Sequence, residues 1–331
     1  MPIDLRQQAL TLNAILYIFT PLKEKSHSMG VKMKKYQEME FFEFQEFFQT
    51  EQQCFEHLKK IRWGDGFHCP KCGYTEAYFI EERKIFQCKH CRFQASLTAN
   101  TMFHRSHLPL RKWFWAIYLV GTDTRGCSAT LLERLLDIHY QTAWLMIHKI
   151  RAAFQDRDAN YMLNSVIEMD DAFFGGSAVG KRGRGADNKT QVIVSVENRG
   201  KKAGFAKMTI VETLDASTVE TFAQRTVRNG STIRTDGYSS YRVLAKHYNH
   251  DGKTVPPQAA PFLLPWVHTL IGNAKTFLRG TYHGVSHKHL QRYLDEFCYR
   301  FNRRFTKSDI LDRILTAALT APIVTYAELT R

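Results

Sequence analysis

The stretch VIEMDDAFFGG, from Val166 to Gly176, places two adjacent aspartates after an apolar run and before an aromatic pair. Apolar and β-branched residues that end at glycines predict a strand. Successive side chains of a strand point to opposite faces of a sheet, so Glu168 and Asp170 share one face and Asp171 lies on the other. Only one of these two faces can contribute its acidic side chains to a site, and Asp170 is the candidate metal ligand.

Three further runs after this stretch continue the strand pattern: TQVIVSVEN (190–198), AKMTIVETL (206–214) and STIRTDG (231–237). DASTVETFAQRTVRNG, between the last two, predicts a helix that Asp215 or Ser217 caps and Gly230 closes. We therefore expect a sheet of three successive strands, followed by a helix and a further strand. A helical C-terminal third follows.

A second carboxylate, Asp236, ends the strand STIRTDG, where Gly237 breaks the run. Two carboxylates brought together from different strands repel each other unless a divalent cation neutralises them, and Mg²⁺ prefers such hard oxygen ligands. We expect Asp170 and Asp236 to hold two Mg²⁺ or Mn²⁺ ions. Two such ions about 4 Å apart activate a water or a 3′-hydroxyl and stabilise the leaving oxygen of phosphodiester transfer.

The bulk composition favours a nucleic-acid partner. The 331 residues include 46 Lys plus Arg against 32 Asp plus Glu, a net charge of +14 that is spread through the chain. Such an excess favours a polyanion. No run approaches the roughly 20 apolar residues that span a membrane, which predicts a cytoplasmic protein with no membrane partner.

Four of the seven cysteines form two CxxC pairs, with Cys69 and Cys72 in the first and Cys88 and Cys91 in the second. In a reducing compartment this spacing indicates metal binding more than disulfides. Four thiolates complete a tetrahedral shell and leave no open position. We therefore expect one structural Zn²⁺.

A helix-turn-helix pattern follows in CSATLLERLLDIHYQTAWLMIHKIRAAF, residues 127–154. Ser128 caps the first helix and residues 137–139 form the turn. The second helix would enter the major groove of DNA and carry Gln141, Lys149 and Arg151 as contacts. Two ordinary packed helices would explain the same apolar positions.

Several blocks together resemble one family. IEMDDAFFGG, TDGYSSY and GTYHGVSHKHLQRYLDEFCYRFNRR are similar to signature blocks of the IS1595-type (ISXO2-like) insertion-sequence transposases. The cysteine module with TANTMFHRSHLPLRKW resembles the zinc ribbon and linker of that family. The resemblance covers roughly residues 40 to 305. It implies an α/β (α+β multidomain) chain, with a ribonuclease-H-like DDE domain preceded by a zinc ribbon and a helix-turn-helix region. Asp170 and Asp236 correspond to the first two acids.

The third acid of the DDE pattern is missing, because WVHTLIGNAKTFLRGTYHG contains no carboxylate. Helical geometry favours His268, which shares a face with Lys275 and lies about 140° from Asn273. Ligand chemistry favours Asn273, whose carbonyl oxygen suits Mg²⁺, and the family has branches with Asn here. We predict Asn273, with His268 as the alternative and Lys275 and Arg279 as phosphate contacts.

Two further charged groups lie near these motifs. GKRGRGADNK carries Lys181, Arg182 and Arg184, which a mobile loop would bring to the DNA backbone, although a solvated loop is an equal alternative. Glu296 is a remote carboxylate candidate, for which an ion pair with Arg300 is the favoured role.

The expected organisation has six parts: an N-terminal extension that is not native if translation starts later (1–38), a helical lead-in (39–62), a zinc ribbon (63–97), a helix-turn-helix region (98–160), the catalytic domain (161–305) and a helical tail (306–331). The resemblance implies a prokaryotic, nucleoid-associated transposase. A homodimer or larger assembly is expected to bind terminal inverted repeats and target DNA and to catalyse Mg²⁺-dependent strand cleavage and strand transfer. The alternative is an inactive DNA-binding protein or repressor, consistent with the missing carboxylate.

Overall fold

The computed structural model describes residues 40–123, 125–175, 189–256, 259–305 and 310–331. All described residues belong to one compact unit, Tyr36–Arg331. None of the described helices is long and apolar enough to cross a membrane.

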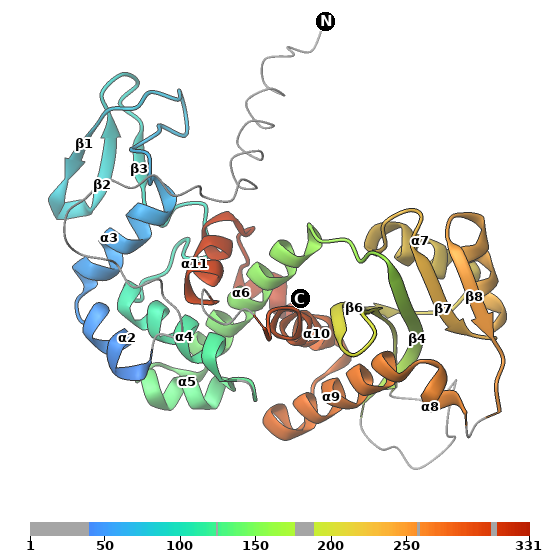
Figure 1. The fold of residues 1–331 in the computed structure, drawn as a ribbon. Coiled ribbons are helices and arrows are strands. Elements are labelled where there is room, and N and C mark those ends of the chain that lie inside the picture. The colour runs from blue at the N-terminus through green and yellow to red at the C-terminus, as the bar shows by residue number, and fades with distance from the viewer. Residues whose placement is uncertain (1–39, 124, 176–188, 257–258, 306–309) are drawn as a thin grey trace, which may run out of the picture. The chain divides into compact units, whose positions relative to one another are not determined.

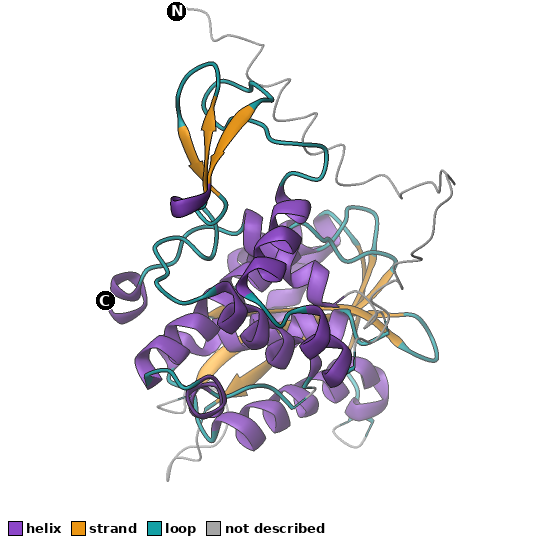
Figure 2. Ribbon diagram, turned by 90° about the vertical axis from the view of Figure 1, so that its left-hand side faces the viewer, coloured by secondary structure: helices purple, strands orange, loops and turns teal. Residues whose placement is uncertain are grey.

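The cysteine module is a small antiparallel sheet with strand order β1-β2-β3, drawn as three short orange arrows in Figure 2. Helices α2 (Phe41–Phe47) and α3 (Glu51–Arg62) precede it. The sheet consists of β1 (Ala77–Ile80), the short helix η1 (Glu81–Arg83), β2 (Ile85–Cys88) and β3 (Gln94–Ser96). Phe86 of β2 is buried against Phe55, Trp63 and Phe67. An aromatic cluster therefore joins this sheet to α3.

A helical region follows the cysteine module, with α4 (Leu110–Thr122), α5 (Ala129–Leu136) and α6 (Tyr140–Ala159). Ser128 caps α5 by accepting from the Leu131 amide, as the sequence predicts. Two C-terminal helices, α11 (Ile310–Thr320) and α12 (Tyr326–Thr330), end the chain, and α11 packs against α3, α4 and α6. The last part of the chain thus completes the core of an N-terminal region.

The second sheet has the strand order β6-β5-β4-β7-β8. Its strands are β4 (Val166–Phe174), β5 (Thr190–Asn198), β6 (Ala203–Val211), β7 (Thr232–Asp236) and β8 (Asn249–Lys253). The first three run antiparallel in sequence order, and β7 and β8 run parallel to β4. This arrangement is the ribonuclease-H-like topology and confirms the predicted fold class.

Helices cover both faces of this sheet (Figure 1). On one face, α7 (Ala216–Thr226) and η2 (Ser239–Lys246) share a core with Ile167 and Met169 of β4. On the other face, α9 (Pro265–Tyr282), which follows the short α8 (Ala260–Leu263), and α10 (His287–Asn302) share a core with Ala172 and Phe174. Alternation along β4 therefore turns Glu168 and Asp170 toward the α9 side, where the site is built.

Candidate active site

Asp170 of β4 lies close to the imidazole of His268, which is in the first turn of α9. The Nδ1 atom of His268 is 3.7 Å from Oδ2 of Asp170, with 37% of the His268 side chain and 16% of the Asp170 side chain exposed. The partial exposure leaves both groups reachable from solvent. Of the two alternatives on this helix, His268 is the one that the structure brings to Asp170.

Asp236 ends the strand next to Asp170. The parallel pairing of β4 with β7 matches Ile167 with Ile233 and Glu168 with Arg234. Continued by two residues on each strand, the same register sets Asp236 beside Asp170. The side chains at these positions alternate in step, so the two carboxylates share the α9 face of the sheet. The amide of Tyr238 donates to Oδ1 of Asp236 at 3.1 Å and holds that carboxylate at the strand end.

Glu168 is the third acidic residue on this face, and its role is not predictable from the sequence. Its side chain is completely buried. Oε2 accepts from the amides of Trp266 at 2.8 Å and Val267 at 2.9 Å, and Oε1 accepts from Nδ2 of Asn198 at 2.7 Å. Glu168 therefore fastens the first turn of α9 to the strand that carries Asp170. The alternation of acidic residues in VIEMDD predicts that Glu168 shares a face with Asp170, but it does not predict that the amides of α9 are its partners.

Asn273 lies on a different side of α9 from the basic residues of that helix. His268, Lys275 and Arg279 follow one border of the buried face, whereas Asn273 is exposed and lies about 140° from His268 around the axis. Lys275 is half-buried, with its Nζ 5.5 Å from the centre of the Phe174 ring. Burial, with Arg279 and Lys189 nearby, lowers the pKa of Lys275. Lys275 and Arg279 thus lie about two and three turns farther along α9 than His268, on the same border of the helix.

The four predicted zinc ligands converge. The sulfurs of Cys69, Cys72, Cys88 and Cys91 all lie within 4.8 Å of one another. Gly73 adopts a positive φ of 75° directly after the first pair, and its amide donates to the Cys69 carbonyl at 2.8 Å, closing a tight knuckle. Four thiolates at this separation fit one tetrahedral zinc ion, which has no room left for substrate. The cluster supports a structural zinc.

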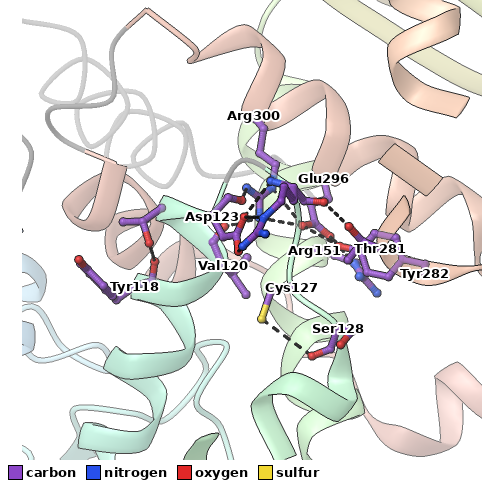
Figure 3. A network of polar contacts seen from close by, with 12 residues as sticks. Tyr118, Val120, Asp123, Cys127, Ser128, Arg151, Thr281, Tyr282, Glu296 and Arg300 are labelled. Atoms are coloured by element: carbon purple, nitrogen blue, oxygen red, sulfur yellow. Dashed lines mark hydrogen bonds and ion pairs between the residues drawn. The ribbon is translucent and has the colours of Figure 1, made fainter. Parts of the chain in front are cut away.

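Arg151 and Lys149 are turned away from solvent, which corrects their expected position on the DNA-binding face of α6. The Arg151 side chain is 2% exposed and its Nε is 2.8 Å from Oε2 of Glu296. Glu296 also pairs with Arg300 at 3.0 Å, as the sequence predicted, and Figure 3 shows this network. Nζ of Lys149 is buried and donates to two backbone carbonyls, those of Met102 and His104. Both cations serve the packing of α6 against its neighbours.

The remaining predicted DNA contacts differ in exposure. Gln141, at the start of α6, is exposed. Arg279 is exposed as well. Lys181, Arg182 and Arg184 fall outside the described residues.

Comparison with known proteins gives two family matches. Residues 162–302 match the ISXO2-like transposase domain, and residues 49–94 match the transposase zinc-ribbon domain. A curated relative from Halobacterium salinarum, described as an uncharacterized protein in transposable element ISH50, is 25% identical over 216 residues, which are 60% of this chain and 71% of the relative.

Two solved Mos1 transposase complexes are similar at a low level. The paired-end complex with the left transposon end has a TM-score of 0.28 and 11% identity, over 62% of this chain and 78% of that one. The strand transfer complex has a TM-score of 0.28 and 12% identity, over 61% of this chain and 75% of that one. The ribonuclease-H-like assignment rests instead on the strand order and the matched domain.

Proposed function

Because the chain belongs to the IS1595-type (ISXO2-like) transposases, we propose that it binds the terminal inverted repeats of its insertion sequence and catalyses metal-dependent cleavage and strand transfer there. The observation that carries this proposal is the approach of His268 to Asp170, on the strand next to the one that Asp236 ends. Asp170 comes from β4, Asp236 from the end of β7, and His268 from α9. The 3.7 Å approach to Asp170 supports His268 as the third residue, in place of Asn273.

The donor set fits hard divalent cations. Two carboxylates that share one face of the sheet supply oxygen ligands of the kind that Mg²⁺ and Mn²⁺ take, and the imidazole of His268 suits Mn²⁺ better than Mg²⁺. Asp170 and Asp236 would hold the ions, with His268 completing the shell. When bound, such ions activate the attacking oxygen and stabilise the leaving one.

The reaction exchanges one phosphodiester bond at a time. The oxygen of a water attacks the phosphorus at the element end, and the bond from phosphorus to the 3′ oxygen breaks. The products are a 3′-hydroxyl on the element and a 5′-phosphate on the flanking DNA. That 3′-hydroxyl oxygen then attacks a target phosphorus, while the target strand leaves with its own 3′-hydroxyl. Lys275 and Arg279 would orient the DNA backbone by contacting its phosphates.

DNA recognition would use the zinc ribbon and the exposed start of α6, where Gln141 lies. The basic residues Lys181, Arg182 and Arg184 would add contacts to the DNA backbone. Because an element has two ends to join, we expect at least two copies of the chain on the DNA. The net charge of +14 favours this association and makes it depend on salt.

The second candidate is a DNA-binding repressor of transposase descent, which the lack of a third carboxylate favours. Purified protein, incubated with labelled element ends and Mg²⁺ or Mn²⁺, separates the two. The transposase cuts the 3′ end of the element and joins it to target DNA, and Asp170→Ala binds the ends without cutting them. Wild-type protein that binds specifically but never cuts with either metal would establish the repressor.

A further inference from the structure

We propose that Glu168 is a positioning residue, which fixes the first turn of α9 so that His268 meets Asp170. This inference rests on the proposed function, because it assigns Glu168 to the same catalytic site. Glu168 itself faces no solvent and is not expected to touch DNA or metal, since its side chain is completely buried. Its role would be exerted through the helix that it holds.

The start of α9 lacks a cap of its own. Leu264 occupies the N-cap position and has no side-chain oxygen to offer, and Pro265 follows at the first helical position. The first amides of a helix have no partner within the helix and need an acceptor. Oε2 of Glu168 accepts from both Trp266 and Val267. A residue of the neighbouring strand thus supplies the cap that the helix sequence does not contain.

The chemistry of the carboxylate suits this task. A negative charge near a helix N-terminus is favoured by the partial positive charge of the unpaired amides. Oε1 of Glu168 is held by Nδ2 of Asn198, while Oδ1 of Asn198 accepts from the amide of Gly200 at 2.8 Å. Asn198 at the end of β5 therefore holds the Glu168 carboxylate in place, and the carboxylate cannot rotate without losing this hydrogen bond.

The cap is close in sequence to both members of the catalytic pair. Asp170 stands two residues beyond Glu168 on β4, and His268 directly follows Val267 on α9. The hydrogen bond from the Val267 amide to Glu168 thus links α9 to β4, next to the point where His268 approaches Asp170. Loosening this link would let the helix start shift, and a misplacement of about 1 Å costs on the order of 100-fold in rate.

Glu197 offers a matched control. It is also a buried glutamate of this sheet, 1% exposed, and it accepts from the amides of Asn164 and Phe205, both at 3.1 Å. These partners lie outside α9. Glu168→Ala and Glu197→Ala therefore each remove a buried carboxylate and leave two backbone amides without their acceptor. Glu197→Ala also removes an ion pair with Arg199, and only Glu168→Ala should affect His268.

The test compares Glu168→Ala, Glu168→Gln and Glu197→Ala in three measurements: thermal stability, binding of element ends, and the rate of 3′-end cleavage. Hydrogen exchange of the Trp266 and Val267 amides is a fourth measurement, which needs no activity. We expect Glu168→Ala to cut about 100-fold more slowly than wild type while binding DNA normally. Glu168→Gln, which keeps one acceptor, should retain more activity than Glu168→Ala. The two amides should exchange faster in Glu168→Ala and unchanged in Glu197→Ala.

Two results would overturn the inference. One is a loss of cleavage in Glu168→Ala no greater than in Glu197→Ala at equal thermal stability. The other is unchanged exchange of the two amides in Glu168→Ala. If wild-type protein never cuts DNA, the proposed function fails on its own, and amide exchange still decides whether Glu168 anchors the helix.

Discussion

His268 Nδ1 lies 3.7 Å from Asp170 Oδ2, which brings a helix of the last third of the chain close to the first strand of the five-stranded sheet. Helical periodicity predicts that His268 shares a face with Lys275, but it does not say which face of α9 meets β4. Ligand preference pointed to Asn273 because an amide oxygen suits Mg²⁺. The approach of His268 to Asp170 makes the histidine the stronger candidate, and the two choices predict different mutants.

His268→Ala should abolish cleavage, and Asn273→Ala should leave it nearly intact. We expect a loss of about 100-fold or more for the first, since it removes a group beside the reacting centre, and a change within about threefold for the second. The rate of 3′-end cleavage at saturating DNA is the measurement. Binding of the element ends serves as control and should be the same in both variants. An inactive Asn273→Ala beside an active His268→Ala would identify Asn273 as the third residue of the site.

Arg151→Ala should destabilise the fold. Removing one partner of a buried ion pair leaves Glu296 without its closest cation and typically costs about 3–5 kcal/mol. Urea unfolding measures this cost. Arg157→Ala, on the same helix but more exposed, is the matched control and should cost less than about 1 kcal/mol. If Arg151→Ala is as stable as Arg157→Ala and loses affinity for DNA, Arg151 contacts DNA after all.

The zinc content of the purified protein should depend on the four cysteines of the zinc ribbon. Wild-type protein should carry about one Zn²⁺ per chain, and Cys72→Ser should carry much less, because three thiolates bind the ion more weakly than four. Metal analysis of the purified chains measures both. Cys127→Ala is the control, since this buried cysteine lies outside the cluster and should leave the zinc content unchanged. Equal zinc in Cys72→Ser and wild type would contradict the assignment.

Asp295 predicts a pH dependence of stability. Burial raises its pKa to about 7, and nearby Asp158 adds to the rise, against the opposing effects of Gln291 and Arg292. The unfolded chain ionises this group near pH 4. Between about pH 4 and pH 7 the folded state alone keeps the proton, so the contribution of Asp295 is fully present below pH 4 and is lost as the pH rises.

The amide of Asp295→Asn cannot ionise, so this variant should not lose stability as the pH rises from about 4 to about 7. Relative to wild type, its free energy of unfolding should rise between pH 4 and pH 8, by about 1–3 kcal/mol. Urea unfolding of both chains at several pH values measures the difference. The same difference at every pH would show that Asp295 titrates normally in the folded protein.

Local patterns made much of the fold predictable. The CxxC spacing located all four sulfurs of the cluster, and alternation in VIEMDDAFF located the strand and its acidic face. Asp215 caps α7 as predicted, with its Oδ1 accepting from the Thr218 amide. In each case the residues that define the feature are neighbours or stand at a fixed spacing, so the sequence alone carries the information.

Long-range partners were not predictable in the same way. β8 is a polar edge strand, NHDGK, without the apolar alternation that marks a strand. The sequence of α6 predicts an exposed position for Arg151, because nothing local indicates its partner Glu296, which lies far along the chain. The same holds for the site, where periodicity predicts the face of Asp170 but only the packing of α9 on β4 shows that His268 lies close to it.

The most direct test of the central claim locates the divalent metal on the chain. Fe²⁺ in place of Mg²⁺, with ascorbate and peroxide, cleaves the backbone next to the bound ion, and mass spectrometry maps the cuts. The account predicts cuts near Asp170, Asp236 and His268 together, and their loss in Asp170→Ala while cuts elsewhere persist. Cuts absent from all three segments, or unchanged in Asp170→Ala, would contradict it.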